Sequence, residues 1–327
     1  MVLNKKTSGV TVSPVISIVG NFDKVGDFVL GNLTVAAATK GVPFLGEVGV
    51  TVEVREVNSP PDYAPDIRRY NVFKSVNGIV FFRDIPFLGK AFVAYKNLNS
   101  NIPVLEWNPL FRWWSNLPVT KVGYIGHHLE SIIAFKLLER GMVLMHGSAV
   151  SIKDSAILFT GLPNQGKTYT AMELIREGYE FLSEDICILS RSGEVFSVPF
   201  TTSLKGGAHK SPKKTLLDIF TDLKISPVSK LSKVVILEKA QESSFFRLSL
   251  TEAVRKILLI NHLEFHYHRN VLLRTYLALH SLSPIHHFMA LEEEIIRDAI
   301  SENQIYLVRF SDHSFRMQLV RQVVKEV

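Results

Sequence analysis

The stretch Gly161-Leu162-Pro163-Asn164-Gln165-Gly166-Lys167-Thr168 decides the fold of this chain. It follows a short apolar run over residues 155–160 and leads directly into a helical pattern. A glycine at each end lets the loop turn so tightly that its backbone N–H groups point at phosphate oxygens. The lysine can then reach the terminal phosphates, and the threonine hydroxyl can ligate Mg²⁺. The positive end of the helix dipole adds to the same spot. The sequence therefore predicts a phosphate-binding P-loop.

The residues assigned to nucleotide binding are the eight of this loop together with Tyr169, which follows them. Lys167 is also assigned to catalysis, and Thr168 to the metal. The alternative is a glycine-containing strand-to-helix turn without a ligand, which leaves the Lys-Thr pair unexplained. The cofactors expected from this motif are ATP and Mg²⁺.

Length and composition describe a globular protein. The 327 residues leave room for two domains of ordinary size, and 46% hydrophobic with 21% charged residues is typical of a packed chain. No run of about 18 apolar residues exists, so we expect no membrane-spanning helix and no membrane partner. The single cysteine, Cys187, excludes an internal disulfide, and without an export signal this favours a cytoplasmic location. Cys187 lies in an apolar stretch typical of a packed thiol.

The charge is basic but mostly scattered. A formal charge of +6 with a pI near 9.2 permits nucleic-acid binding without requiring it, and we expect no nucleic-acid partner. Residues 205–214 are the exception, because four lysines and a histidine occur there with no acidic residue. This composition predicts a basic loop that contacts substrate or phosphate, with an ordinary solvated loop as the alternative.

The chain divides into a β-rich part and an α/β part. Residues 47–55 alternate strictly, and residues 78–83 and 91–96 add two short strands, so we expect a β-rich N-terminal domain over residues 1–120. The order strand, P-loop, helix, strand, acidic pair predicts an α/β P-loop nucleotide-binding kinase domain over residues 121–327. Its expected helices cover residues 128–140, 251–260 and 283–301, and its expected strands cover residues 142–152, 155–160, 179–183, 186–189, 233–238, 245–248 and 304–310.

Two adjacent acidic residues, Glu184 and Asp185, follow the strand after the P-loop helix. Phosphoryl transfer needs a cradle for phosphates, a metal, and an acceptor for the proton of the attacking hydroxyl. A strand placed beside the P-loop strand would bring the two carboxylates to the mouth of the loop. One can then hold Mg²⁺ or its water while the other acts as the base. The alternative is a solvated acidic turn.

Three segments together resemble the HPr kinase/phosphorylase family of bacterial serine kinases, in its catalytic domain. They are residues 144–148 (Leu-Met-His-Gly-Ser), residues 161–168, and residues 176–185 (Arg-Glu-Gly-Tyr-Glu-Phe-Leu-Ser-Glu-Asp), and the resemblance covers roughly residues 141–200. It implies an ATP-dependent serine kinase in which His146 lies by the transferred phosphate and Lys167 and Thr168 bind phosphate and Mg²⁺. It also implies that Asp185 accepts the proton of the substrate serine, while Glu184 replaces the first acid of the family's Asp-Asp pair.

The chain also departs from that family. The reversible enzymes carry a further loop with a Glu and an Arg soon after the acidic pair, and the corresponding residues 201–207 contain neither. This leaves the phosphorylase half of the activity and recognition of HPr open. The pattern is similar to the divergent HPr-kinase-like proteins, some of which phosphorylate a serine on a ribosomally made peptide such as a lasso peptide. The expected partner is therefore a protein or peptide bearing a serine, and a homo-oligomer is left open.

Other functions stay open on the sequence alone: a P-loop NTPase, a nucleotide-sensing module without turnover, and a small-molecule kinase. The guanine-specific Asn-Lys-x-Asp motif is absent, which argues against a GTPase. Residues 262–266 (His-Leu-Glu-Phe-His) place two histidines four apart, but the Glu is one place late for the zinc-protease motif. The candidates for a charge-stabilising arginine are Arg247, Arg255, Arg269 and Arg274.

Overall fold

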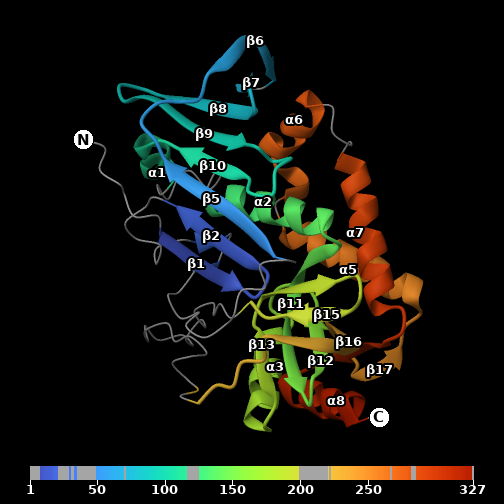
Figure 1. The fold of residues 1–327 in the computed structure, drawn as a ribbon. Coiled ribbons are helices and arrows are strands. Elements are labelled where there is room, and N and C mark those ends of the chain that lie inside the picture. Colours follow the sequence, from blue (N-terminus) through green and yellow to red (C-terminus); the bar gives the residue numbers. More distant parts are fainter. Residues whose placement is uncertain are drawn as a thin grey trace. The chain divides into compact units, whose positions relative to one another are not determined.

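The computed structural model describes residues 8–20, 29–30, 33–34, 49–69, 71–115, 125–198, 220, 222–265, 267–280 and 285–325. Its contacts form two compact units (Figure 1). The first unit is Met1–Arg140 with His266–Ala290, and the second is Gly141–Phe265 with Leu291–Val327. This division does not coincide with the expected boundary after residue 120, because the helix over residues 125–139 and a later segment group with the first unit. The basic loop expected at residues 205–214 lies outside the described residues.

The first unit contains an eight-stranded sheet in the order β1-β2-β5-β10-β9-β8-β7-β6. The alternating stretch of the sequence forms β5, whose apolar residues are buried and whose polar residues are partly exposed. Its strands are β1 (Ser8–Ser13), β2 (Ile16–Gly20), β5 (Val50–Glu56), β6 (Tyr63–Arg69), β7 (Val72–Ser75), β8 (Gly78–Ile85), β9 (Gly89–Lys96) and β10 (Val104–Trp107), with a separate pair β3 (Val29–Leu30) and β4 (Leu33–Thr34). Its helices are α1 (Pro109–Ser115), α2 (Ile125–Glu139), η2 (Tyr267–Arg269) and α6 (Val271–Leu279).

The second unit holds the predicted loop and has a mixed sheet in the order β12-β11-β14-β15-β16-β18-β17. β12 also pairs with β16, so five strands close into a ring, and β13 pairs with β11. Its strands are β11 (Met142–Ile152), β12 (Ser155–Thr160), β13 (Glu180–Ser183), β14 (Ile186–Ser190), β15 (Glu194–Phe196), β16 (Val228–Lys239), β17 (Ser244–Arg247) and β18 (Gln304–Phe310). Its helices are α3 (Lys167–Arg176), α5 (Leu250–Glu264) and α8 (His313–Lys325), and α7 (Ile285–Ile300) carries residues of both units.

Strands β12, β16 and β18 run parallel to one another, which brings their carboxyl ends to one edge of the sheet. Thr160 at the end of β12 pairs with Ile236, and Ile236 pairs with Leu307. In α/β proteins with open sheets and with closed barrels alike, ligands commonly bind at the carboxyl ends of parallel strands. The segment after β12 and the start of α8 after β18 therefore meet at the edge where a site is expected. The mixed α/β class is confirmed by this arrangement.

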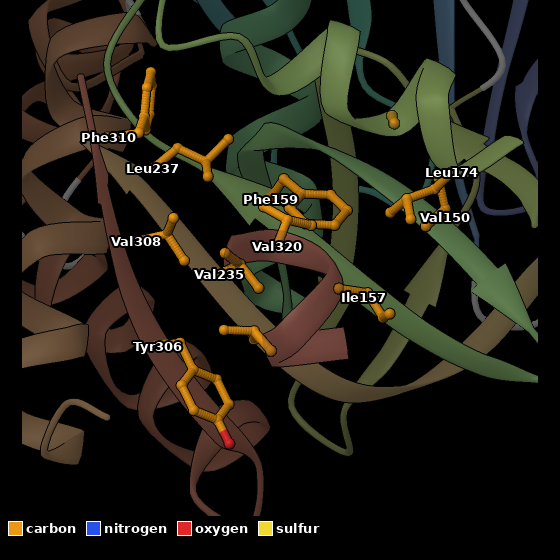
Figure 2. Close-up of a cluster of buried hydrophobic side chains, with 12 residues drawn as sticks. Val150, Ile157, Phe159, Leu174, Val235, Leu237, Tyr306, Val308, Phe310 and Val320 are labelled. Atoms are coloured by element: carbon orange, nitrogen blue, oxygen red, sulfur yellow. The ribbon is translucent and has the colours of Figure 1, made fainter. Parts of the chain in front are cut away.

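Two helices cover one face of this sheet and hold the edge in place. The buried cluster in Figure 2 joins Phe159 of β12, Val235 of β16 and Val308 of β18 to Leu174 of α3 and Val320 of α8. Each strand contributes alternate residues to this face, as the period of a pleated strand requires. Burying the cluster fixes α3 and α8 against the strands that carry the loop. In the described part of the chain, no helix is both long and apolar enough to cross a membrane.

Candidate active site

The loop between β12 and α3 is packed tightly onto the neighbouring strand. At Gly161 the backbone has φ 154, and a Cβ would lie 2.5 Å from the carbonyl oxygen of Leu237 in β16. Only glycine allows this approach. The side chain of Gln165 accepts a hydrogen bond from the backbone N–H of Lys239, which ties the loop to the end of β16. The loop, which continues from β12, is therefore fixed to the end of the neighbouring parallel strand β16.

The loop ends at Gly166, which adopts a left-handed conformation at the start of α3 with φ 80. Glycine has no side chain that could cap the helix, so among the described residues no side-chain cap holds the first backbone N–H groups of α3, where an anion can bind. Lys167 is 7% exposed, and its Nζ donates to the carbonyl oxygens of Gly161 at 2.8 Å and Leu162 at 3.1 Å. Its ammonium group therefore lies back over its own loop.

His146 lies on β11 beside the end of β12. Thr160 Oγ1 donates to its carbonyl oxygen at 2.8 Å, and its own N–H donates to Asn261 Oδ1 of α5 at 3.0 Å. Asn261 is fully buried and also donates through Nδ2 to the carbonyl oxygen of Leu144 at 3.1 Å. Both bonds go to the backbone of β11, so Asn261 fixes α5 against the strand that carries His146.

The acidic pair lies between β13 and β14, and both of these strands pair with β11. The expectation that their strand would lie directly beside the P-loop strand is wrong, because β11 lies between them. Asp185 is still tied to the strand next to β12, since the N–H of Gly147 donates to the backbone carbonyl oxygen of Asp185 at 2.9 Å and Gly147 pairs with Thr160. Asp185 is thus level with the end of β12.

The side chains around His146 form a cluster of opposite charges. Its Nδ1 is 3.6 Å from Asp185 Oδ1, and its Nε2 is 4.0 Å from Glu264 Oε2 of α5. Burial raises the pKa of Asp185, and the nearby charge of Lys167 opposes this shift. Burial also raises the pKa of Glu264, with Lys167 opposing and Asp185 reinforcing the shift. Burial and the charge of Lys167 lower the pKa of His146 to about 3, so its ring is neutral at physiological pH.

This cluster has the parts of a proton-transfer site. Asp185 keeps 31% of its side chain exposed, so a substrate hydroxyl can approach it. A raised pKa makes a carboxylate a stronger proton acceptor once it is ionised. His146 Nε2 is buried without a hydrogen-bond partner in the described part of the chain, which is uncommon for a buried polar atom.

The structure brings some of the predicted residues together and leaves others apart. Lys167, Asp185 and His146 form one cluster, while Thr168 is half-buried in the first turn of α3. Glu184 is 1% exposed, and its carbonyl oxygen accepts a hydrogen bond from Ser148 Oγ. Its role as a metal ligand stays a prediction. Four of the residues assigned to nucleotide binding are exposed: Leu162, Pro163 and Asn164 of the loop, and Tyr169, which follows Thr168 in α3.

The sequence motifs did not identify three residues of this site: Asn261, Glu264 and Arg316. Glu264 belongs to the His-Leu-Glu-Phe-His segment of residues 262–266, in which His262 Nε2 lies 3.2 Å from Glu292 Oε2. Arg316 packs against Gly166 although the sequence pointed to other arginines. Its place at the start of α8, after the third parallel strand, is the signal that could have found it. Cys187 is fully buried, and burial raises its pKa to about 12, as expected for a packed thiol.

Replacing Asn261 with alanine is expected to lower the free energy of unfolding by about 1–3 kcal/mol, because a buried N–H and a buried C=O of β11 lose their partners. The matched control is Asn303→Ala, which removes one partly exposed side-chain bond to the carbonyl oxygen of Ala299. Urea unfolding of both variants measures the difference. Equal midpoints for the two would contradict this role of Asn261.

Comparison with known proteins gives a partial match. No family model matches the chain. HPr kinase/phosphorylases from Listeria welshimeri serovar 6b and Listeria monocytogenes serotype 4a are each 32% identical over 107 residues, which covers 29% of this chain and 30% of each relative. The chain resembles the HPr kinase/phosphorylases. This confirms the resemblance found in the sequence motifs.

The match is limited in extent. The chain spans about 30% of the length of these relatives. A solved structure, the HPr(Ser) kinase/phosphatase from Coxiella burnetii, aligns over 56% of this chain and 93% of its own, with a TM-score of 0.30 and 12% sequence identity.

Proposed function

We propose that this protein is an ATP- and Mg²⁺-dependent kinase that transfers a phosphoryl group to a serine hydroxyl of a protein or peptide. The observation that carries this proposal is the cluster of Lys167, His146 and Asp185 beside a helix start without a side-chain cap. These side chains come from three separate elements and meet at the carboxyl edge of the parallel strands. The resemblance to HPr kinase/phosphorylases supports it.

Each residue has a proposed role in the transfer. Residues 161–169 bind the nucleotide, with the N–H groups of the loop and of α3 on its phosphate oxygens. Lys167 turns from the carbonyl oxygens of its own loop to the terminal phosphates. Asp185 accepts the proton as the serine oxygen attacks the γ-phosphorus, the bond to the β–γ bridging oxygen breaks, and ADP leaves. Neutral His146 lies beside Asp185 and donates to the transferred phosphate.

Thr168 and Glu184 are the proposed metal ligands. Hydroxyl and carboxylate oxygens are the hard donors that Mg²⁺ prefers, so the chemistry of this donor set fits the ion. When bound, Mg²⁺ supplies neutralisation of the negative charge on the phosphates. Thr168 is half-buried at the start of α3, next to the lysine that contacts the loop.

A serine-containing peptide library tests the proposal. If the protein is a kinase, ATP should be consumed slowly without an acceptor and fast with one. Mass spectrometry should then find the phosphate on serine peptides and not on their alanine counterparts. Loss of ATP to free phosphate at one rate with or without peptides would support the NTPase alternative instead. Transfer to a small-molecule hydroxyl with no peptide phosphorylation would make the acceptor class wrong while leaving the kinase chemistry intact.

A further inference from the structure

A buried arginine lies against the start of α3. Arg316 of α8 is 5% exposed, and its guanidinium group fills the space beside the glycine at the end of the loop. A Cβ at Gly166 would lie 1.8 Å from Nη1 and 2.5 Å from Cζ of Arg316. Gly166 therefore serves two purposes, since it adopts a left-handed conformation and leaves room for the guanidinium. The result is a cation at the N-terminus of a helix.

The guanidinium group contacts Phe310 and His313, and one of its N–H donors makes no hydrogen bond within the described residues. Its Cζ lies 5.4 Å from the ring centroid of Phe310, and Nη2 lies 3.1 Å from His313 Nδ1. Its buried Nε has no hydrogen-bond partner, and no carboxylate lies within ion-pair distance, among the residues that the structure describes. Burial lowers the pKa of Arg316, while Glu173 and Tyr169 oppose the shift.

This placement is unfavourable without a ligand. The N-terminus of α3 carries positive partial charge, so a second positive group beside it is repelled. A buried charge without a paired opposite charge is costly as well. One anion between the guanidinium and the first N–H groups of α3 would relieve both costs, because arginine donors and helix N-termini both bind phosphate.

The neighbours of Arg316 indicate which phosphate this is. Asp185 lies on the β11 side of β12, since its carbonyl oxygen accepts from the N–H of Gly147 in β11. Arg316 lies on α8, which follows β18, and β18 pairs with β16 on the other side of β12. The transferred phosphate must lie on the Asp185 side of the loop, so the nucleoside end of the ligand lies on the other side. The ring of Tyr169 is 6.2 Å from that of His313, and Tyr169 is 48% exposed, which offers an open aromatic surface there.

We propose that Arg316 binds the α-phosphate of the nucleotide, with the nucleoside against Tyr169 and His313. This inference rests on the proposed function, since it assumes that the loop takes a nucleoside polyphosphate. It adds a phosphate contact from the last helix of the chain to the contacts made by residues 161–169. It also fixes the direction in which the nucleotide lies across the loop.

The test is calorimetric titration of ADP and of inorganic pyrophosphate into Arg316→Gln. We expect ADP affinity to fall about 10- to 100-fold, the value of a charge-assisted hydrogen bond, and pyrophosphate affinity to change less than about threefold. Arg316→Lys should retain part of the ADP affinity. The matched control is Arg321→Gln on the same helix, where an exposed ion pair with Glu177 at 2.6 Å is lost and ADP affinity should stay unchanged.

Three results would overturn the inference. Unchanged ADP affinity in Arg316→Gln removes the contact altogether. An equal loss for ADP and pyrophosphate assigns the arginine to the β- and γ-phosphates instead of the α-phosphate. A lower melting temperature of the ligand-free variant with normal ADP affinity assigns it to the fold, whereas our proposal expects that temperature to hold or rise. If the unaltered protein binds neither ADP nor pyrophosphate, the proposed function fails first.

Discussion

Replacing Asp185 with asparagine is expected to lower kcat for the serine acceptor by about 10²- to 10⁴-fold while ATP still binds, because asparagine keeps the shape of the side chain but cannot accept the proton. The measurement is steady-state transfer to the peptide acceptor, with ATP affinity determined by calorimetry. Asp185 is the better placed acid, since its side chain is 31% exposed and Lys167 is close enough to act on its pKa. Normal kcat in this variant would remove Asp185 from catalysis.

The pH dependence of kcat separates Asp185 from its neighbours. Burial raises the pKa of Asp185 above the ordinary value of 3.8, so the carboxylate becomes protonated, and kcat falls, at a pH above that value. His146 has a pKa of about 3 and does not titrate in that range. The acid limb should therefore disappear in Asp185→Asn and persist in His146→Gln.

Glu264→Gln is the matched control, because burial raises the pKa of Glu264 as well and this carboxylate faces the same histidine. If Asp185 is the base, Glu264→Gln keeps the acid limb. Loss of the limb in Glu264→Gln alone would make Glu264 the base.

Glu184→Gln should raise the Mg²⁺ concentration needed for activity, and excess Mg²⁺ should restore part of its rate. If excess Mg²⁺ rescues Asp185→Asn but not Glu184→Gln, then Asp185 is the metal ligand and Glu184 is the base.

The local part of the fold could be predicted from the sequence. β12 covers residues 155–160 as expected, because an apolar run followed by a glycine loop is a short-range signal. α8 follows a local cap, where Asp312 Oδ1 accepts hydrogen bonds from the N–H groups of Ser314 and Phe315. α5 begins at a capping box formed by Ser249 and Glu252. These signals all lie within a few residues of the element they define.

The non-local part could not be predicted in the same way. Strand order depends on pairing between distant segments, so nothing near Asp185 indicated that β11 separates its strand from β12. Asn261 and Glu264 enter the site from α5, more than 100 residues after the histidine that they contact. A helix pattern identifies α5 but not the strand on which it packs. Arg316 depends in addition on the parallel register of three strands.

Replacing Lys167 with methionine is expected to weaken ATP binding and to lower kcat by about 10²-fold or more, since the charged donor that we propose for the terminal phosphates is lost. Methionine keeps the apolar stem, so the fold should stay intact. The matched control is Lys233→Met, because Lys233 is also 7% exposed and also donates to backbone carbonyl oxygens, those of Val323 at 2.8 Å and Val324 at 3.0 Å in α8.

The two lysines differ in what surrounds their carbonyl partners. Lys233 binds the C-terminal carbonyl groups of a helix, where a cation is favourable, so its loss should lower the melting temperature and leave ATP affinity nearly unchanged. Lys167 binds carbonyl groups of a loop beside the N-terminus of α3, where a cation is unfavourable until an anion arrives. Its loss should therefore cost little stability and most of the ATP affinity. Calorimetry and thermal unfolding of both variants test this contrast, and unchanged ATP affinity with full activity in Lys167→Met would remove the loop from nucleotide binding.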